Sequence, residues 1–225
     1  MMTNLFSIFD PSTSIMNIKM NWMSSLMSMM LLTNMYWMMN NRFTTMWSKP
    51  FKMLNKEFKI LMNQKKNKGT TMMFITMFLI IMINNLMGLF PYTFTSTSHL
   101  SMTLTLALPM WLAFMMFGWM KNTESMFMHM VPTGTPNILM PFMVLIESIS
   151  NIIRPGTLSI RLAANMIAGH LILTLLGNTT MSVPMNILPS MMIIQMMLLT
   201  LETAVAIIQS YVFAVLSTLY ASEVN

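Results

Sequence analysis

Five ionisable residues lie inside two long apolar stretches of the chain, and a sixth follows near its end. They are Glu147, Arg154, Arg161, His170, Glu202 and Glu223. If these stretches cross a bilayer, each charge costs about 2.5–3.5 kcal/mol at the helix centre, and such residues usually mark ion or proton pathways. Buried His and carboxylate groups can exchange protons, whereas Arg keeps its charge. These residue types predict intramembrane proton or ion handling; the alternative is a set of ion pairs that only holds helices together.

The spacing places three of these residues on one side of a helix. Glu147, Arg154 and Arg161 recur every seven residues, and each step of seven drifts by only about 20° around an α-helix. Small residues lie within about 60° of Arg161, which favours close approach of another helix; they are Ala164, Asn165 and Ala168. His170 lies about 180° from Arg161 and must face a different neighbour.

The last apolar stretch repeats the same spacing with Gln195, Glu202 and Gln209. If the two stretches are antiparallel helices, one register sets three pairs at equal depth. These pairs are Arg161 with Gln209, His170 with Glu202, and Glu147 with Glu223. The result is a ladder in which a fixed cation separates two titratable clusters, one near the turn at 177–184 and one at the opposite end.

The composition defines the elements that must position these residues. The chain has 225 residues, of which 55% are hydrophobic and only 8% charged, with a mean hydropathy of +0.63. Since an average globular chain is about 25% charged, a soluble enzyme is excluded. We predict an all-α membrane protein, a single integral membrane domain over residues 1–225 with about five to six hydrophobic helices.

The apolar stretches give the boundaries of these helices. A first span is expected at 18–39, further spans at 71–90 and 100–120, a polar loop at 121–136, and two long helices at 137–176 and 185–222. A single helix from Ser190 to Tyr220 would be about 46 Å long, whereas the hydrocarbon core is only about 30 Å thick. The last two helices should therefore be strongly tilted against a protein partner and form an antiparallel hairpin.

The basic residues indicate the orientation of the chain in the membrane. Eight of the twelve Lys and Arg residues lie in the segment 40–69, with apolar residues at helical spacing between them. This pattern predicts an amphipathic matrix-side segment rather than a nucleic-acid site, and recognition of a specific anionic lipid is a competing interpretation. Alternating spans then place the 177–184 turn outside and Glu223 on the matrix side.

Several other functions find no support in the sequence. The chain has no Cys and only three scattered His residues, so no metal site and no cofactor are expected. A nucleotide-binding GxxxxGK[ST] motif is also missing, which predicts that any nucleotide chemistry resides in other chains. A self-contained proton-coupled secondary transporter is the alternative function, but it should show two related halves, and we find no such repeat.

Two runs carry a resemblance to a known family. IESISNIIRPGTLSIRLAANMIAGH ends at His170, and ETAVAIIQSYVFAVLSTLY begins at Glu202. Together they closely resemble subunit a (subunit 6) of the F-type ATP synthases. PNILMPFMV at Pro136 and NNLMGLFPY at Asn84 extend the resemblance more weakly. Bacterial relatives tend to carry a carboxylate at the His170 position and a His at the Glu202 position. The two are exchanged here, so the arrangement resembles the mitochondrial form.

The resemblance implies a non-hydrolytic, proton-translocating stator subunit of the membrane Fo sector in the mitochondrial inner membrane. Its implied partners are the c-ring subunits, other Fo stator and peripheral-stalk subunits, the lipid bilayer and protons, with no nucleic acid. Proton flow through two offset half-channels against the rotating ring would be coupled to rotation and to ATP synthesis.

The resemblance also implies roles for single residues. Arg161 matches the essential arginine that faces the ring carboxylate. His170 and Glu202 match the half-channel to the intermembrane space, whereas Glu147 and Glu223 match the matrix half-channel. Asn165 and Gln209 match the supporting polar residues that neighbour this arginine in the family. Arg154 is not a universal family position, and neither the spacing nor the resemblance gives it a role.

Overall fold

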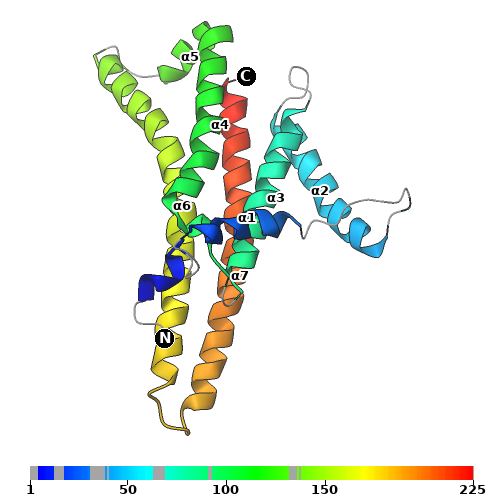
Figure 1. The fold of residues 1–225 in the computed structure, drawn as a ribbon. Helices are drawn as coiled ribbons and strands as arrows, with labels where there is room; N and C mark the ends of the chain where they lie inside the picture. The colour runs from blue at the N-terminus through cyan, green and yellow to red at the C-terminus, as the bar shows by residue number, and fades with distance from the viewer. Residues whose placement is uncertain are drawn as a thin grey trace.

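The computed structural model describes residues 5–12, 18–30, 39, 41–62, 69–90, 93–131, 136 and 138–224. Within these ranges every regular element is a helix (Figure 1), so the predicted all-α membrane architecture is confirmed. Four helices are long and apolar enough to cross a membrane. They are α3 (Thr70–Gly88), α4 (Leu100–Lys121), α6 (Met140–Thr180) and α7 (Leu188–Val224).

The last two helices form the predicted long antiparallel hairpin, which is the largest feature of the fold (Figure 1). Pro141 stands at the start of α6, where a missing backbone N–H costs nothing. Pro155 lies inside the same helix, and Figure 1 shows the first part of α6 inclined away from α7. Because proline removes one backbone hydrogen bond, Pro155 accounts for this change of direction.

The core lies between α2, α3, α4, α6 and α7. Its fully buried large side chains include Phe58, Phe74, Ile81, Leu162 and Phe213. Buried Ser and Thr residues on α6 and α7 donate hydrogen bonds to backbone carbonyls three residues earlier. Small polar side chains are therefore satisfied within their own helix, which allows close helix packing without unpaired polar groups.

A basic helix, α2 (Arg42–Leu61), packs against α3 and α7 at the side of the bundle. Phe58 of this helix is buried, whereas the helix exposes four lysines on its outer side, Lys49, Lys52, Lys56 and Lys59. Gly69 has φ 104° directly before α3, a left-handed conformation that glycine adopts at little cost. The matrix-side placement of segment 40–69 stays a prediction, and residues 40 and 63–68 lie outside the described residues.

The predicted first span at 18–39 is only partly described. Its described residues form a 3-10 turn, η2 (Met20–Trp22), and a short helix, α1 (Met23–Met29). Ser28 donates a hydrogen bond to Asn84 Oδ1 over 2.6 Å, which holds α1 against α3. Residues 31–38 lie outside the described residues, so the membrane crossing of this segment stays a prediction.

The expected polar loop at 121–136 contains a short helix, α5 (Thr123–Met130), so this expectation was wrong for eight residues. Glu124 lies in the first turn and His129 in the last turn, the ends at which the helix dipole favours an acid and a base respectively. Phe127 contacts Trp119 edge to face with 5.2 Å between ring centroids. Local charge placement and aromatic packing therefore overcome the polar composition of this segment.

Candidate functional site

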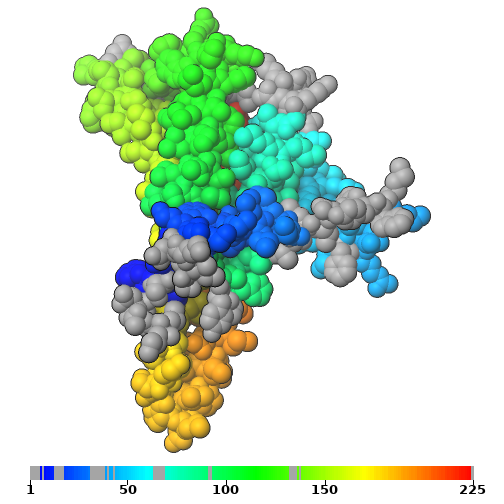
Figure 2. Space-filling model, viewed as in Figure 1, coloured from blue at the N-terminus to red at the C-terminus, as the bar shows by residue number. Residues whose placement is uncertain are grey.

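The seven predicted site residues lie on the two long helices. α6 carries Glu147, Arg161, Asn165 and His170, and α7 carries Glu202, Gln209 and Glu223. The lower halves of these helices stand clear of the rest of the molecule in Figure 2. The structure brings six of the seven residues into three groups along the hairpin and leaves Arg161 apart.

The first group lies toward the α6–α7 turn and contains His170 and Glu202. Glu202 is 7% exposed, and both of its carboxylate oxygens are buried without a hydrogen-bond partner among the described protein atoms. The same holds for Nε2 of His170. Both residues line a cavity of about 220 Å³ between the helices, which is room for several waters at about 30 Å³ each.

The missing side chain of Gly169 leaves room for the Glu202 carboxylate at this group. A methyl group added at Gly169 would lie 2.7 Å from Oε1 and 3.0 Å from the carboxyl carbon of Glu202. A side chain at this position would therefore displace the Glu202 carboxylate. Gly169 carries no signal in the sequence, because its contact partner belongs to the other helix.

The second group joins the helices midway. Nδ2 of Asn165 donates a hydrogen bond to Oε1 of Gln209 over 3.0 Å, and Gln209 is buried. This contact fixes the register in which Glu202 faces Gly169. The sequence had set Gln209 level with Arg161, whereas the structure pairs it with Asn165, one helical turn further along α6.

Arg161 lies one helical turn before Asn165, on the outer face of α6. It is exposed together with Ala164, Asn165 and Ala168, the stripe of small residues that the sequence predicts. Within the part of the chain that the structure describes, its guanidinium makes no ion pair or hydrogen bond. An unpaired cation on an apolar helix is costly in a bilayer, so a charge at this position is unusual for a purely structural helix.

The third group lies at the opposite end of the hairpin, where Arg154 bridges two acids. Its Nη2 lies 3.3 Å from Oε1 of Glu147, and its Nη1 lies 2.5 Å from Oε2 of Glu223. The guanidinium also lies over the Tyr220 ring, 5.1 Å from the ring centre. Arg154 therefore holds together the two carboxylates that the sequence placed at equal depth.

This bridge is the main contact that the sequence analysis missed. The seven-residue spacing already placed Arg154 on the same face as Glu147, but nothing local indicated that Glu223 reaches across from α7. The bridged residues line a cavity of about 560 Å³ between α4, α5, α6 and α7, together with Trp119 and His129. Two cavities with titratable walls thus lie on either side of the level of Arg161.

The fold and this site define a helical membrane protein with two separate clusters of titratable residues and, between their levels, an arginine without a partner in the described part of the chain. The ATP synthase A chain family matches residues 2–222, and the chain belongs to this family. Among its relatives, ATP synthase subunit a of Aedes aegypti and that of Anopheles gambiae are each 60% identical over 226 residues, covering 100% of both chains. ATP synthase subunit a of Drosophila melanogaster is 59% identical over 225 residues, again with complete coverage of both chains.

Family membership decides between the functions that the sequence left open. The predicted resemblance and the main function, that of the proton-translocating stator subunit of the Fo sector, are confirmed. Membership of this family disfavours the alternative function, that of a self-contained secondary transporter. The protein is thus a membrane subunit that works within an ATP synthase complex.

Proposed function

We propose that this chain conducts protons across the mitochondrial inner membrane through two half-channels that meet beside a rotating ring of c subunits. The observation that carries the proposal is Arg161, an exposed cation without a partner in the described chain, placed between two titratable clusters. Arg cannot release its proton, and its charge repels a proton that would pass directly between the clusters. A proton must then travel on an acid of the neighbouring ring.

The half-channel to the intermembrane space is formed by His170, Glu202 and the cavity between them. Both side chains present buried polar atoms that protein atoms leave unpaired, and water in the cavity can relay protons to them. A proton passes from this cavity toward the open face of α6, where a ring carboxylate accepts it. Neutralised in this way, that carboxylate can leave Arg161 and enter the lipid.

The matrix half-channel is formed by the cluster of Glu147, Arg154 and Glu223 and the cavity that it lines. As a protonated ring acid approaches Arg161 from the other side, the guanidinium favours its ionised form. The released proton then reaches the two carboxylates and leaves into the matrix. Each elementary charge that crosses 100 mV releases about 2.3 kcal/mol, which drives the rotation.

Cysteine crosslinking tests the position of the ring. Because the chain has no Cys, single replacements introduce a unique thiol. Ala164→Cys and Ala168→Cys, both on the Arg161 face, should form disulfides with a cysteine placed next to the essential carboxylate of the c subunit. Met116→Cys on α4, which is 61% exposed, serves as the control. If Met116→Cys formed the disulfide with the c subunit and neither Ala164→Cys nor Ala168→Cys did, the proposal would be overturned.

The close contact between Gly169 and Glu202 predicts a selective loss of proton transfer. Gly169→Ala should lower ATP-driven proton pumping by about fivefold to tenfold, since a change of 1.36 kcal/mol in an activation barrier corresponds to tenfold and the new methyl group displaces the carboxylate. Gly156→Ala on the same helix meets nothing within 4 Å and should pump normally. Equal pumping by both variants in assembled complexes would show that the position of the carboxylate does not matter.

Removing the bridging cation predicts a slower release of protons to the matrix. Arg154→Gln leaves Glu147 and Glu223 facing each other without a counter-charge, and two nearby carboxylates cannot both ionise easily. ATP synthesis should fall by about threefold, with an effect of less than 1.36 kcal/mol on the barrier. Arg42→Gln removes an exposed cation from α2 and should leave the rate unchanged. If Arg154→Gln synthesised ATP at the wild-type rate in the assembled complex, the cluster would not be part of the proton pathway.

A further inference from the structure

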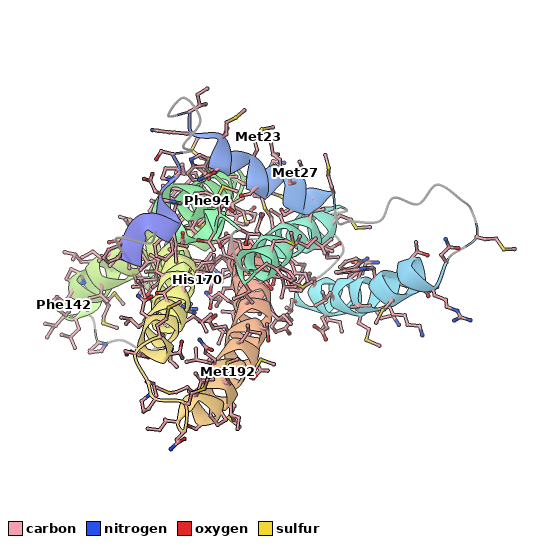
Figure 3. All side chains as sticks on the ribbon, turned by 60° about the horizontal axis from the view of Figure 1, so that its bottom comes forward. Met23, Met27, Phe94, Phe142, His170 and Met192 are labelled. Carbon is pink, nitrogen blue, oxygen red and sulfur yellow. The ribbon has the colours of Figure 1, made fainter. Side chains whose placement is uncertain are left out.

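The N-terminal residues contact the hairpin at His170. A short 3-10 helix, η1 (Leu5–Phe9), packs against α6. The Phe9 ring meets the His170 imidazole edge to face, with 6.3 Å between ring centroids and 84° between ring planes. Figure 3 shows His170 on α6 next to this N-terminal helix. Edge-to-face pairs of this kind are a favourable arrangement of aromatic rings.

Three hydrogen bonds hold the turn that follows Phe9. The backbone N–H and the hydroxyl of Ser12 donate to Oδ1 of Asp10 over 3.0 and 2.8 Å. Nδ2 of Asn21 donates to the backbone oxygen of Asp10 over 3.1 Å, which ties the turn to η2. The hydrogen bonds from Ser12 also lower the pKa of the Asp10 carboxyl, because they favour its ionised form.

Phe9 covers a side of His170 that does not face the cavity. The cavity of about 220 Å³ is lined by His170 and Glu202 but not by Phe9. Phe9 is half-buried, and Nε2 of His170 is buried. An apolar ring on one side and a cavity with titratable walls on the other limit the orientations that the imidazole can adopt.

We propose that Phe9 is a positioning residue for proton uptake, whose ring shields the outer side of His170 and keeps the imidazole available to the Glu202 cavity. This inference rests on the proposed half-channel. The N-terminal segment then forms part of the wall of that half-channel, contributed by a region of the chain distant in sequence from both long helices. The anchored turn at Asp10 supplies the rigidity that such a wall requires.

A metal bridge tests whether position 9 faces His170 in the assembled complex. Phe9→His would place two imidazoles in contact, and paired imidazoles bind Zn²⁺ at about 2.0–2.1 Å from each nitrogen. The Zn²⁺ concentration that halves proton pumping should fall about tenfold or more in this variant, because two protein ligands hold the ion instead of one. Phe6→His is the matched control, because Phe6 lies in the same short helix and is 67% exposed. Equal Zn²⁺ sensitivity of the two variants would overturn the proposal.

Chemical modification tests the shielding itself. Diethyl pyrocarbonate acylates accessible imidazoles, and mass spectrometry of the intact ATP synthase after treatment reports the modification of His170. Phe9→Ala should raise the modification rate by about fivefold or more, as expected when a locally protected group becomes open to solvent. Phe9→Trp should restore slow modification, and Phe6→Ala should match the wild type. A wild-type rate in Phe9→Ala, or an equal increase in Phe6→Ala, would contradict the role of Phe9.

The two readouts separate this inference from the proposed half-channel. Modification of His170 is measured by mass, whereas its consequence is measured as loss of proton pumping. If His170 becomes acylated in Phe9→Ala and pumping persists, Phe9 shields His170 but His170 is not on the proton path. If acylation inhibits pumping but Phe9→Ala does not accelerate it, the half-channel stands and the role of Phe9 fails.

Discussion

Replacing Arg161 by Gln should reduce ATP-driven proton pumping to about 1% of the wild-type rate or less, a loss of about 2.7 kcal/mol at 1.36 kcal/mol per tenfold. The guanidinium is exposed on the small-residue face of α6 and has no partner among the described residues. Without its charge, nothing attracts the ionised ring carboxylate, and nothing repels a proton moving between the two clusters. Pumping into reconstituted vesicles, followed with a pH-sensitive dye, measures the loss.

The same substitution should increase passive proton leak through the membrane sector after the ATP-hydrolysing part is removed. Loss of pumping with a gain of leak distinguishes a missing barrier from a misfolded subunit, which would lose both. Arg161→Lys keeps the charge but replaces a planar, permanently charged group by a flexible ammonium, so pumping should stay well below the wild type. Near-normal pumping in either variant would leave only a scaffold role for this helix.

Replacing Glu202 by Gln should lower both ATP synthesis and pumping to about 5% of the wild-type rate or less, a barrier increase near 1.8 kcal/mol at 1.36 kcal/mol per tenfold. The amide has almost the same volume as the carboxyl group, so the contact with Gly169 and the packing of the hairpin persist. What the variant loses is the ability to take up and release a proton beside the cavity shared with His170.

A matched substitution separates this effect from a general loss of negative charge. Glu124→Gln on α5 removes an exposed carboxylate that belongs to none of the three groups on the hairpin, and it should leave both rates unchanged. The assembled complex should form normally with either variant, because Glu202 makes no hydrogen bond or ion pair within the described chain. Wild-type synthesis by Glu202→Gln would exclude this carboxylate from the proton path.

The sequence was most informative where the signal lies within one helix. The seven-residue step placed Glu147 and Arg154 on one side of α6, where the two side chains form an ion pair, because helical geometry fixes the angle between residues of the same helix. The small residues after Arg161 likewise correctly predicted an open face. Repeats on both helices also set His170 and Glu202 at equal depth, and these two residues line one cavity, whereas Gln209 bonds to Asn165 rather than standing level with Arg161.

Contacts between distant segments could not be obtained in this way. Arg154 had no assigned role until α7 brought Glu223 to its guanidinium, and Gly169 became important only because Glu202 packs directly on it. The contact between Phe9 and His170 left no periodic signal, since the two residues belong to separate elements. The helix α5 was missed because its stability depends on tertiary contacts such as that of Phe127 with Trp119.

The sequence by itself therefore determined the membrane class, the long helices, the sign and spacing of their charges and the family of the protein. Only the tertiary structure decided which charges pair, which remain unpaired and which segments wall the cavities. The physical reason is that periodicity within a helix is set by covalent and hydrogen-bond geometry, whereas pairing between helices depends on how side chains of different segments fill shared space. Arg161 illustrates both kinds of information: its position follows from the helix repeat, but that no described residue pairs with it is visible only in the folded hairpin.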